Sequence, residues 1–252
     1  MKDQQQSLTT IVTGSSSGIG REIARTFLQA GHRVVLNGRD PEKLARVQDE
    51  LASTAPDAGA RLASVAGGIG NPETGRLLAS TAIERFGPID VLVNNAGTFG
   101  ATPFVDVTEE ELDGYLAGNL KGTYLTTQAV VREMRNSGGG SIVNIGTVLI
   151  DHAVGGLPAS AALVSKGGVH ALTKSLAAEL APDGIRVNLV APGTVRTPLH
   201  ESVDVDAFGE VALLNRVGEA HEIAEAVLYL ATAQFTTGHL LNVDGGFVTG
   251  RA

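Results

Sequence analysis

Short apolar runs rich in β-branched residues alternate along the chain with longer segments of helical periodicity. Buried strands appear as apolar runs, and helices repeat apolar positions every three or four residues. The runs predict strands at Leu8–Val12, Arg33–Leu36, Arg61–Val65, Asp90–Val93, Ser141–Ile145, Arg186–Val190 and Leu240–Val243. The periodic segments predict helices at Ile19–Ala30, Pro41–Leu51, Asn71–Phe86, Glu109–Arg135, Ala159–Leu180 and Ala220–Leu230. This alternation predicts an α/β fold with one doubly wound parallel sheet of about seven strands and helices on both faces.

No linker or internal repeat interrupts this pattern, so residues 1–252 are predicted to form a single domain. Residues 195–216 show neither strand nor helix periodicity. We expect this segment to be an irregular flap on the substrate side of the domain.

Composition narrows the class of protein. The chain has 252 residues, 43% of them hydrophobic, which is enough for one large core. It has no cysteine, which excludes disulfides, thiolate metal sites and cysteine nucleophiles, and we expect no metal. The net charge of −8 argues against a nucleic-acid partner. Met1–Ser7 lacks the apolar core of a signal peptide and no long apolar stretch occurs, so we expect a cytoplasmic protein without membrane contact.

The segment Thr13–Gly20 reads T-G-S-S-S-G-I-G and lies between the first predicted strand and the first predicted helix. A glycine-rich turn at this place lets the backbone approach a pyrophosphate, while the helix N-terminus directs its free N–H groups at the negative charge. A plain structural turn is the alternative. The second strand and helix follow at the expected spacing, which favours a nucleotide site.

Several motifs together carry a family resemblance. They are the loop at 13–20, N-N-A-G at 94–97, Asn119 in G-N-L-K-G, S-I-V-N-I at 141–145, S-K at 165–166, P-G at 192–193 and V-D-G-G at 243–246. In this order and spacing the chain resembles the classical short-chain dehydrogenase/reductases over nearly its whole length. The resemblance implies a Rossmann fold, a nicotinamide cofactor, hydride exchange with a carbonyl or alcohol, and a catalytic Asn-Ser-Tyr-Lys set.

The catalytic set departs from the family pattern. Lys166 is present, but Ala162 occupies the place of the tyrosine, and Thr147 corresponds to the serine. In the family the tyrosine hydroxyl protonates the nascent alkoxide. Because losing a positioned general acid costs about 10²- to 10⁴-fold in rate, the standard mechanism is not expected here.

A substitute proton donor is therefore needed if the chain reduces a carbonyl. His152 is our preferred candidate, because it lies in the segment Val148–Pro158 that lines the substrate pocket in the family, and an imidazole exchanges protons near neutral pH. A solvated loop histidine is the alternative. Tyr115 is interpreted as a packing residue.

The lysine and the asparagine of the family's catalytic set are both present in this chain. By resemblance, Lys166 holds the nicotinamide ribose hydroxyls, and Asn119 fixes a water wired to that lysine. Without the tyrosine, a structural role for Asn119 is the alternative.

The end of the second strand bears on cofactor choice. Gly38-Arg39 leaves room for a 2′-phosphate and offers it a cation, so NADP(H) is favoured over NAD(H), with an exposed turn arginine as the alternative. Gly68 replaces an acidic residue that the family places near the adenine. The resemblance assigns cofactor binding to Gly14, Ser16, Ser17, Gly18, Ile19, Gly20, Gly38, Arg39, Asn95, Ala96, Gly97, Lys166, Pro192, Gly193, Val195 and Thr197.

Small residues recur at three- and four-residue steps along Ala159–Leu180, a helix that the family uses for assembly, so we expect a homodimer or homotetramer. The favoured function is an atypical NADP(H)-dependent oxidoreductase acting on a small carbonyl or alcohol. Two alternatives stay open. One is a redox-inactive subunit that binds nucleotide and partners an active homologue, and the other is a non-redox catalyst for isomerisation, elimination or cyclisation.

Overall fold

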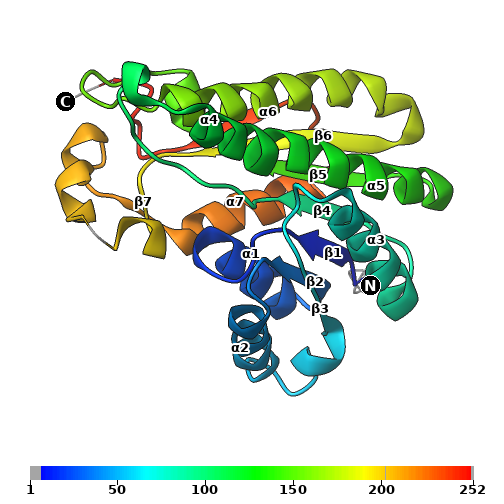
Figure 1. The fold of residues 1–252 in the computed structure, drawn as a ribbon. Helices are drawn as coiled ribbons and strands as arrows, with labels where there is room; N and C mark the ends of the chain where they lie inside the picture. The colour runs from blue at the N-terminus through cyan, green and yellow to red at the C-terminus, as the bar shows by residue number, and fades with distance from the viewer. Residues whose placement is uncertain (1–6, 202, 251–252) are drawn as a thin grey trace.

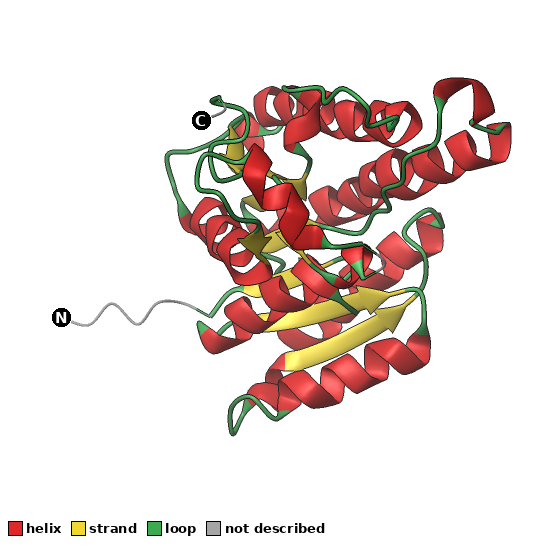
Figure 2. Cartoon of the chain, turned by 90° about the vertical axis from the view of Figure 1, so that its left-hand side faces the viewer, coloured by secondary structure: helices red, strands yellow, loops and turns green. Residues whose placement is uncertain are grey.

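The computed structural model describes residues 7–201 and 203–250. Within them a seven-stranded sheet runs in the order β3-β2-β1-β4-β5-β6-β9. All its strand pairs are parallel, which confirms the predicted α/β fold (Figures 1 and 2). The strands are β1 (Thr9–Val12), β2 (Arg33–Gly38), β3 (Leu62–Ala66), β4 (Val91–Asn94), β5 (Gly140–Ile145), β6 (Ile185–Pro192) and β9 (Leu240–Val243).

Helices cover both faces of this sheet because its strands are apolar on both sides. The helices are α1 (Gly18–Gln29), α2 (Pro41–Ala52), α3 (Pro72–Phe86), α4 (Glu109–Tyr115), α5 (Gly122–Ser137), α6 (Ser160–Glu179) and α7 (Ala220–Thr232). Along β2, Val34 and Leu36 pack with α1 and α2, whereas Val35 packs with the cluster that holds α3, α5 and α6. α7 lies beside α1 on the first face (Figure 1).

The expected helix at 109–135 is wrong as a single helix. The structure has α4, then a π-helical segment at Leu116–Lys121, then α5, which continues to Ser137. Asn119 is buried inside the π-helical segment. Hydrophobic periodicity does not reveal such a widened turn, because the pattern reports which face is apolar and not which carbonyl each backbone N–H reaches.

The segment at 195–216 is more ordered than expected. It begins with β7 (Val195–Arg196), which pairs with β8 (Gly218–Glu219), and it contains 3₁₀ turns at Pro198–His200 and Val205–Val211. In the described residues, no helix combines the length and apolar character needed to cross a bilayer.

Candidate active site

The sheet order reverses at β1, which has β2 on one side and β4 on the other. The loops that leave the carboxyl ends of these strands form the crevice where doubly wound sheets bind ligands. Here those loops are 13–17 after β1 and 95–103 after β4. The fold therefore places the glycine-rich loop at the expected ligand crevice.

The two loops are joined by hydrogen bonds. The Thr13 hydroxyl accepts the backbone N–H groups of Asn95 and Ala96, both at 3.0 Å. The Asn95 side-chain amide donates to the carbonyl oxygens of Thr13, at 2.9 Å, and Gly14, at 3.1 Å. Asn95 therefore holds the loop in shape with its side chain.

Two glycines allow this close approach. Gly14 has φ +63°, and a Cβ there would lie 2.7 Å from the Ala96 Cα. At Gly20 a Cβ would lie 2.3 Å from the Asn95 amide nitrogen. Gly18, with φ +52°, lies beside Thr197 of the flap. Side chains at Gly14 and Gly20 would therefore clash with the loop after β4 or with the loop itself, which explains the glycines at these two positions.

At the end of β2, Gly38 is buried against Ser16, and a Cβ at Gly38 would lie 2.9 Å from the Ser16 hydroxyl oxygen. An acidic side chain of the kind that binds ribose hydroxyls therefore has no room there unless Ser16 moves. Arg39 is exposed, and its aliphatic stem lies 3.8 Å from the place of a Cβ on Gly68.

The structure brings Asn119 and Lys166 together around Gly97. A Cβ on Gly97 would lie 3.0 Å from the Asn119 Oδ1 and 3.3 Å from the Lys166 Nζ. Asn119 accepts the Thr98 N–H at 2.8 Å and donates to the Thr98 carbonyl and the Ser165 hydroxyl, both at 2.9 Å. Its side chain therefore ties the loop after β4 to α6.

Lys166 projects from α6 and donates from Nζ to the Ile145 carbonyl at 2.8 Å. Burial lowers the pKa of this ammonium group to about 8. An amine with such a pKa changes its protonation state close to physiological pH.

Thr147 follows β5, and its hydroxyl accepts the Leu149 N–H at 3.3 Å. Beneath it lies the buried His170, which the sequence analysis did not single out. His170 accepts the Thr147 backbone N–H on Nε2 at 3.4 Å. Lys166 and His170 are four residues apart on α6 and therefore lie on the same face of the helix. Lys166 bonds to Ile145 from this face, and His170 bonds to Thr147.

To accept the Thr147 N–H, the Nε2 atom of His170 must carry no proton. Burial lowers the pKa of His170, nearby Lys166 and Lys174 lower it further, and Asp151 raises it. A polar residue one turn after Lys166 on the predicted helix was the available sequence signal.

His152 lies apart from this hydrogen-bonded cluster. Its half-buried ring makes an edge contact with Phe247, with ring centroids 5.1 Å apart. Among the described residues no hydrogen bond joins its imidazole to Thr147 or Lys166. Two further positions from the sequence analysis are Tyr115 and Ala162. The Tyr115 hydroxyl lies 2.3 Å from the place that a Cβ on Gly100 would occupy. Ala162 is fully buried in α6.

The remaining predicted cofactor residues follow β6. Pro192 is its last residue, Gly193 donates its N–H to the Val243 carbonyl at 3.0 Å, and the buried Val195 starts β7. Gly193 is packed tightly, because a Cβ there would lie 2.9 Å from the Asp244 Cα.

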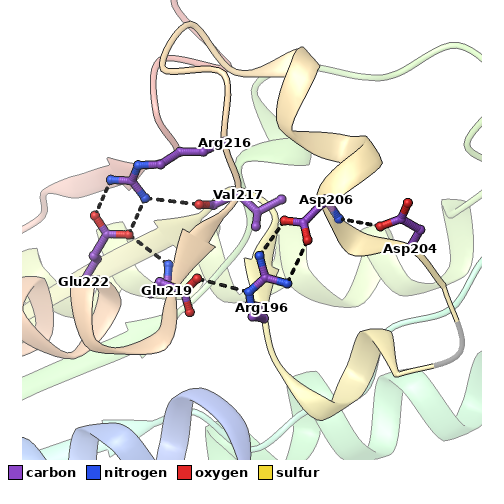
Figure 3. Close-up of polar contacts among 7 residues, drawn as sticks. All are labelled: Arg196, Asp204, Asp206, Arg216, Val217, Glu219 and Glu222. Atoms are coloured by element: carbon purple, nitrogen blue, oxygen red, sulfur yellow. Dashed lines mark hydrogen bonds and ion pairs between the residues drawn. The ribbon is translucent and has the colours of Figure 1, made fainter.

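Ion pairs hold the base of the flap (Figure 3). Arg196 of β7 pairs with Asp206 of the flap and with Glu219 of β8, the latter at 3.1 Å. Arg216 pairs with Glu222, whose carboxylate also accepts the Glu219 N–H at 2.8 Å. The hydrogen bond from Arg216 lowers the pKa of Glu222 to about 2.

The residues present fit a nicotinamide dinucleotide. The cradle of Gly14, Gly18 and Gly20 leaves its backbone free of side chains, Gly38 leaves space beside Ser16, and Lys166 presents an amine near Gly97. Thr147 and Lys166 together offer a hydroxyl and an ammonium group, which can bind a substrate oxygen and sugar hydroxyls.

Comparison with known proteins shows the family of this chain. Residues 14–248 match the family model described as enoyl-(acyl carrier protein) reductase. The chain is 37% identical over 255 residues to the putative ketoacyl reductase 2 of the granaticin polyketide synthase of Streptomyces violaceoruber, covering 97% of each chain. It is 35% identical over 244 residues to a 3-oxoacyl-(acyl-carrier-protein) reductase of Thermotoga maritima, covering 94% of this chain and 96% of that protein.

A solved short-chain type dehydrogenase/reductase from Mycobacterium ulcerans superposes with a TM-score of 0.89 at 30% identity, covering 98% of this chain and 92% of that one. These relatives are oxidoreductases of one fold, and the match extends over nearly the whole chain. The protein belongs to the short-chain dehydrogenase/reductase family.

Proposed function

We propose that this protein is an NADP(H)-dependent oxidoreductase that acts on a carbonyl or alcohol of a small molecule, with a proton donor other than the family's tyrosine. The observation that carries the proposal is the intact cradle, in which the glycine loop is bonded to the loop after β4 while Lys166 and Asn119 meet at Gly97. A chain that no longer bound nucleotide would not need this close packing.

In this function each residue has a defined task. The backbone of Gly14–Gly20 holds the pyrophosphate, and Lys166 holds the nicotinamide ribose. When bound, the cofactor supplies or accepts the hydride. Thr147, positioned by His170, donates a hydrogen bond to the substrate oxygen. His152 donates the proton to the nascent alkoxide and is then reprotonated by solvent, which requires the 148–158 loop to bring its imidazole toward the substrate.

Nucleotide titration tests the proposal directly. We expect NADPH to bind more tightly than NADH, because Gly38 admits a 2′-phosphate and charge-assisted phosphate contacts contribute about 1.5–3 kcal/mol. NADPH fluorescence gives both affinities, and consumption of NADPH with a panel of aldehydes and ketones gives the activity. Equal affinity for both nucleotides would contradict the cofactor assignment.

His152 has its own test within that panel. His152→Gln should lower turnover by about 100-fold and leave NADPH affinity unchanged, because the amide cannot exchange a proton. Unchanged turnover and an unchanged pH profile would remove His152 from the mechanism and leave Thr147 with solvent.

Ala162 favours a second candidate. A methyl group at this place supplies no proton, which also suits a redox-inactive subunit or a non-redox catalyst on the same scaffold. NADPH binding without oxidation across the panel, followed by activation of a co-expressed homologue, would favour the subunit. Conversion of a substrate without change in the cofactor would favour the non-redox catalyst.

We also infer a cytoplasmic homodimer or homotetramer. Support comes from exposed apolar side chains on neighbouring helices of one layer, with Tyr124 of α5 51% exposed and Val164 of α6 61% exposed. Burying such side chains between copies of the chain is favourable in water.

A further inference from the structure

A hollow of about 350 Å³ opens beside the glycine loop, between that loop, α2 and the start of the flap. Ser16 and Ser17 line it from the loop. Arg21 of α1 and Lys43 and Arg46 of α2 add three cationic side chains. None of these cations belongs to the set that the family resemblance assigned to the cofactor.

Some charged side chains around the hollow form ion pairs, and others do not. Glu50 also lines it, but its carboxylate lies within ion-pair distance of both Arg21, at 3.4 Å, and Arg25, at 2.5 Å. Among the described residues, the side chains of Lys43 and Arg46 have no ion-pair or hydrogen-bond partner. The Asp40 carboxylate at the N-terminus of α2 has its pKa lowered by the backbone N–H of Lys43 and by the charges of Arg46 and Lys43, but it forms no ion pair with either side chain, so both cations can still contact an anionic ligand.

The hollow adjoins the place where a dinucleotide's adenosine ribose is expected. Ser16 lines the hollow and also packs on Gly38 at the end of β2. Arg39 does not line it, because its stem lies across Gly68 instead. Arg39 therefore lies on a different surface from Lys43 and Arg46.

We propose that Lys43 and Arg46 are the specificity-determining residues that bind the 2′-phosphate of NADP(H), together with the Ser16 hydroxyl. This inference rests on the proposed cofactor and names the residues that select it. A phosphate monoester carries close to two negative charges at neutral pH, so two nearby cations favour it strongly over the bare ribose hydroxyl of NAD(H).

Glu201 refines the proposal. It lines the hollow from the flap, and among the described residues its carboxylate has no cationic partner. Its negative charge would repel a phosphate bound in the hollow. Glu201→Gln should therefore tighten NADPH binding and leave NADH binding unchanged.

Calorimetric titration of the whole protein tests the inference with NADPH, NADH, adenosine 2′,5′-bisphosphate and AMP. Lys43→Ala and Arg46→Ala should each weaken NADPH and the bisphosphate by about tenfold and leave NADH and AMP unchanged. Both side chains are exposed on a helix surface, and thermal melts check that the variants fold. Arg132→Ala, which removes one charge from an exposed position of α5, is the matched control and should change none of the affinities.

Salt gives an independent readout. Raising ionic strength should reduce the NADPH preference of the wild type more than that of the Lys43→Ala, Arg46→Ala double variant, because screening acts on the charges that the variant lacks. A wild-type preference for NADPH that persists in the double variant but disappears in Arg39→Ala would overturn this inference alone. A wild type that binds both dinucleotides equally, or neither, would overturn it together with the proposed cofactor.

Discussion

Ala162 is the residue that we interpret as standing in the place of the family's tyrosine, and the structure shows what surrounds it. Its side chain is fully buried in α6, four residues before Lys166. Lys166 lies next to Gly97 and donates a hydrogen bond to Ile145, so the polar groups that a phenol at position 162 would need are close to this helix.

Introducing a phenol at position 162 tests whether these groups support carbonyl reduction. Ala162→Tyr should lower the melting temperature, because adding bulk to a buried site costs about 1–3 kcal/mol. It should also raise NADPH-dependent carbonyl reduction above that of Ala162→Phe, which adds nearly the same bulk without the hydroxyl. Equal activity in two folded variants would show that the site no longer aligns a carbonyl for hydride transfer.

The buried His170 should make the free energy of unfolding depend on pH. Its pKa is lowered in the folded protein, so the unfolded chain takes up the proton first as the pH falls below about 6.5. The stability present above that pH is therefore lost as the pH falls through the folded pKa. In His170→Gln the amide oxygen can still accept the Thr147 N–H, but this loss should be absent.

Denaturant unfolding at several pH values measures the difference. The wild type should lose up to about 1.4 kcal/mol per pH unit more than His170→Gln between pH 6.5 and the lower pKa. Other titrating groups, including the buried His32, are common to both proteins and cancel. Parallel curves for the two proteins would show that His170 is not buried in its neutral form.

Among the elements, the short β7–β8 pair anchors the flap. Arg196 joins Asp206 and Glu219, yet all three side chains are largely solvent-exposed. Exposed ion pairs contribute about 0–1 kcal/mol each, so this cluster can set local order without setting global stability.

Arg196→Gln should therefore change the melting temperature little but accelerate amide hydrogen exchange in 203–211. Arg76→Gln, which removes an exposed ion pair with Glu73 on α3, is the matched control and should leave that exchange unchanged. Unaltered flap exchange in Arg196→Gln would mean that packing of the 3₁₀ turns holds the segment without the ion pairs.

In the whole molecule, the layer formed by α4, α5 and α6 is the candidate assembly face (Figure 1). The expected small-residue stripe does not form one outer surface. Ala162 and Ser165 are buried inside the protein and Gly168 packs on Leu120, whereas Ala171 and Ser175 are exposed.

The assembly prediction therefore shifts to the exposed apolar positions. Val164→Glu should reduce the mass measured by analytical ultracentrifugation, because a carboxylate is costly to bury between subunits. Leu77→Glu on α3, where the leucine is 45% exposed, should leave the mass unchanged. A wild-type monomer would contradict the oligomer altogether.

Local chemistry was sufficient to predict the strands, most helices and the tight glycine-rich loop between β1 and α1. Apolar runs such as Val34–Leu36 report burial on both faces of a sheet, and the glycines at 14, 18 and 20 report a backbone that must approach another group closely. These properties belong to consecutive residues, so they are visible without a structure.

Contacts between distant segments were decided only by the tertiary structure. The structural task of Asn95, the π-helical turn around Asn119 and the support of Thr147 by His170 each depend on a partner from another element. The hollow that joins Ser16 to Lys43 and Arg46 likewise exists only once α2 packs beside the glycine loop. Sequence periodicity describes which face of an element is buried, but it does not specify which polar groups meet there, because that depends on how the elements pack in three dimensions.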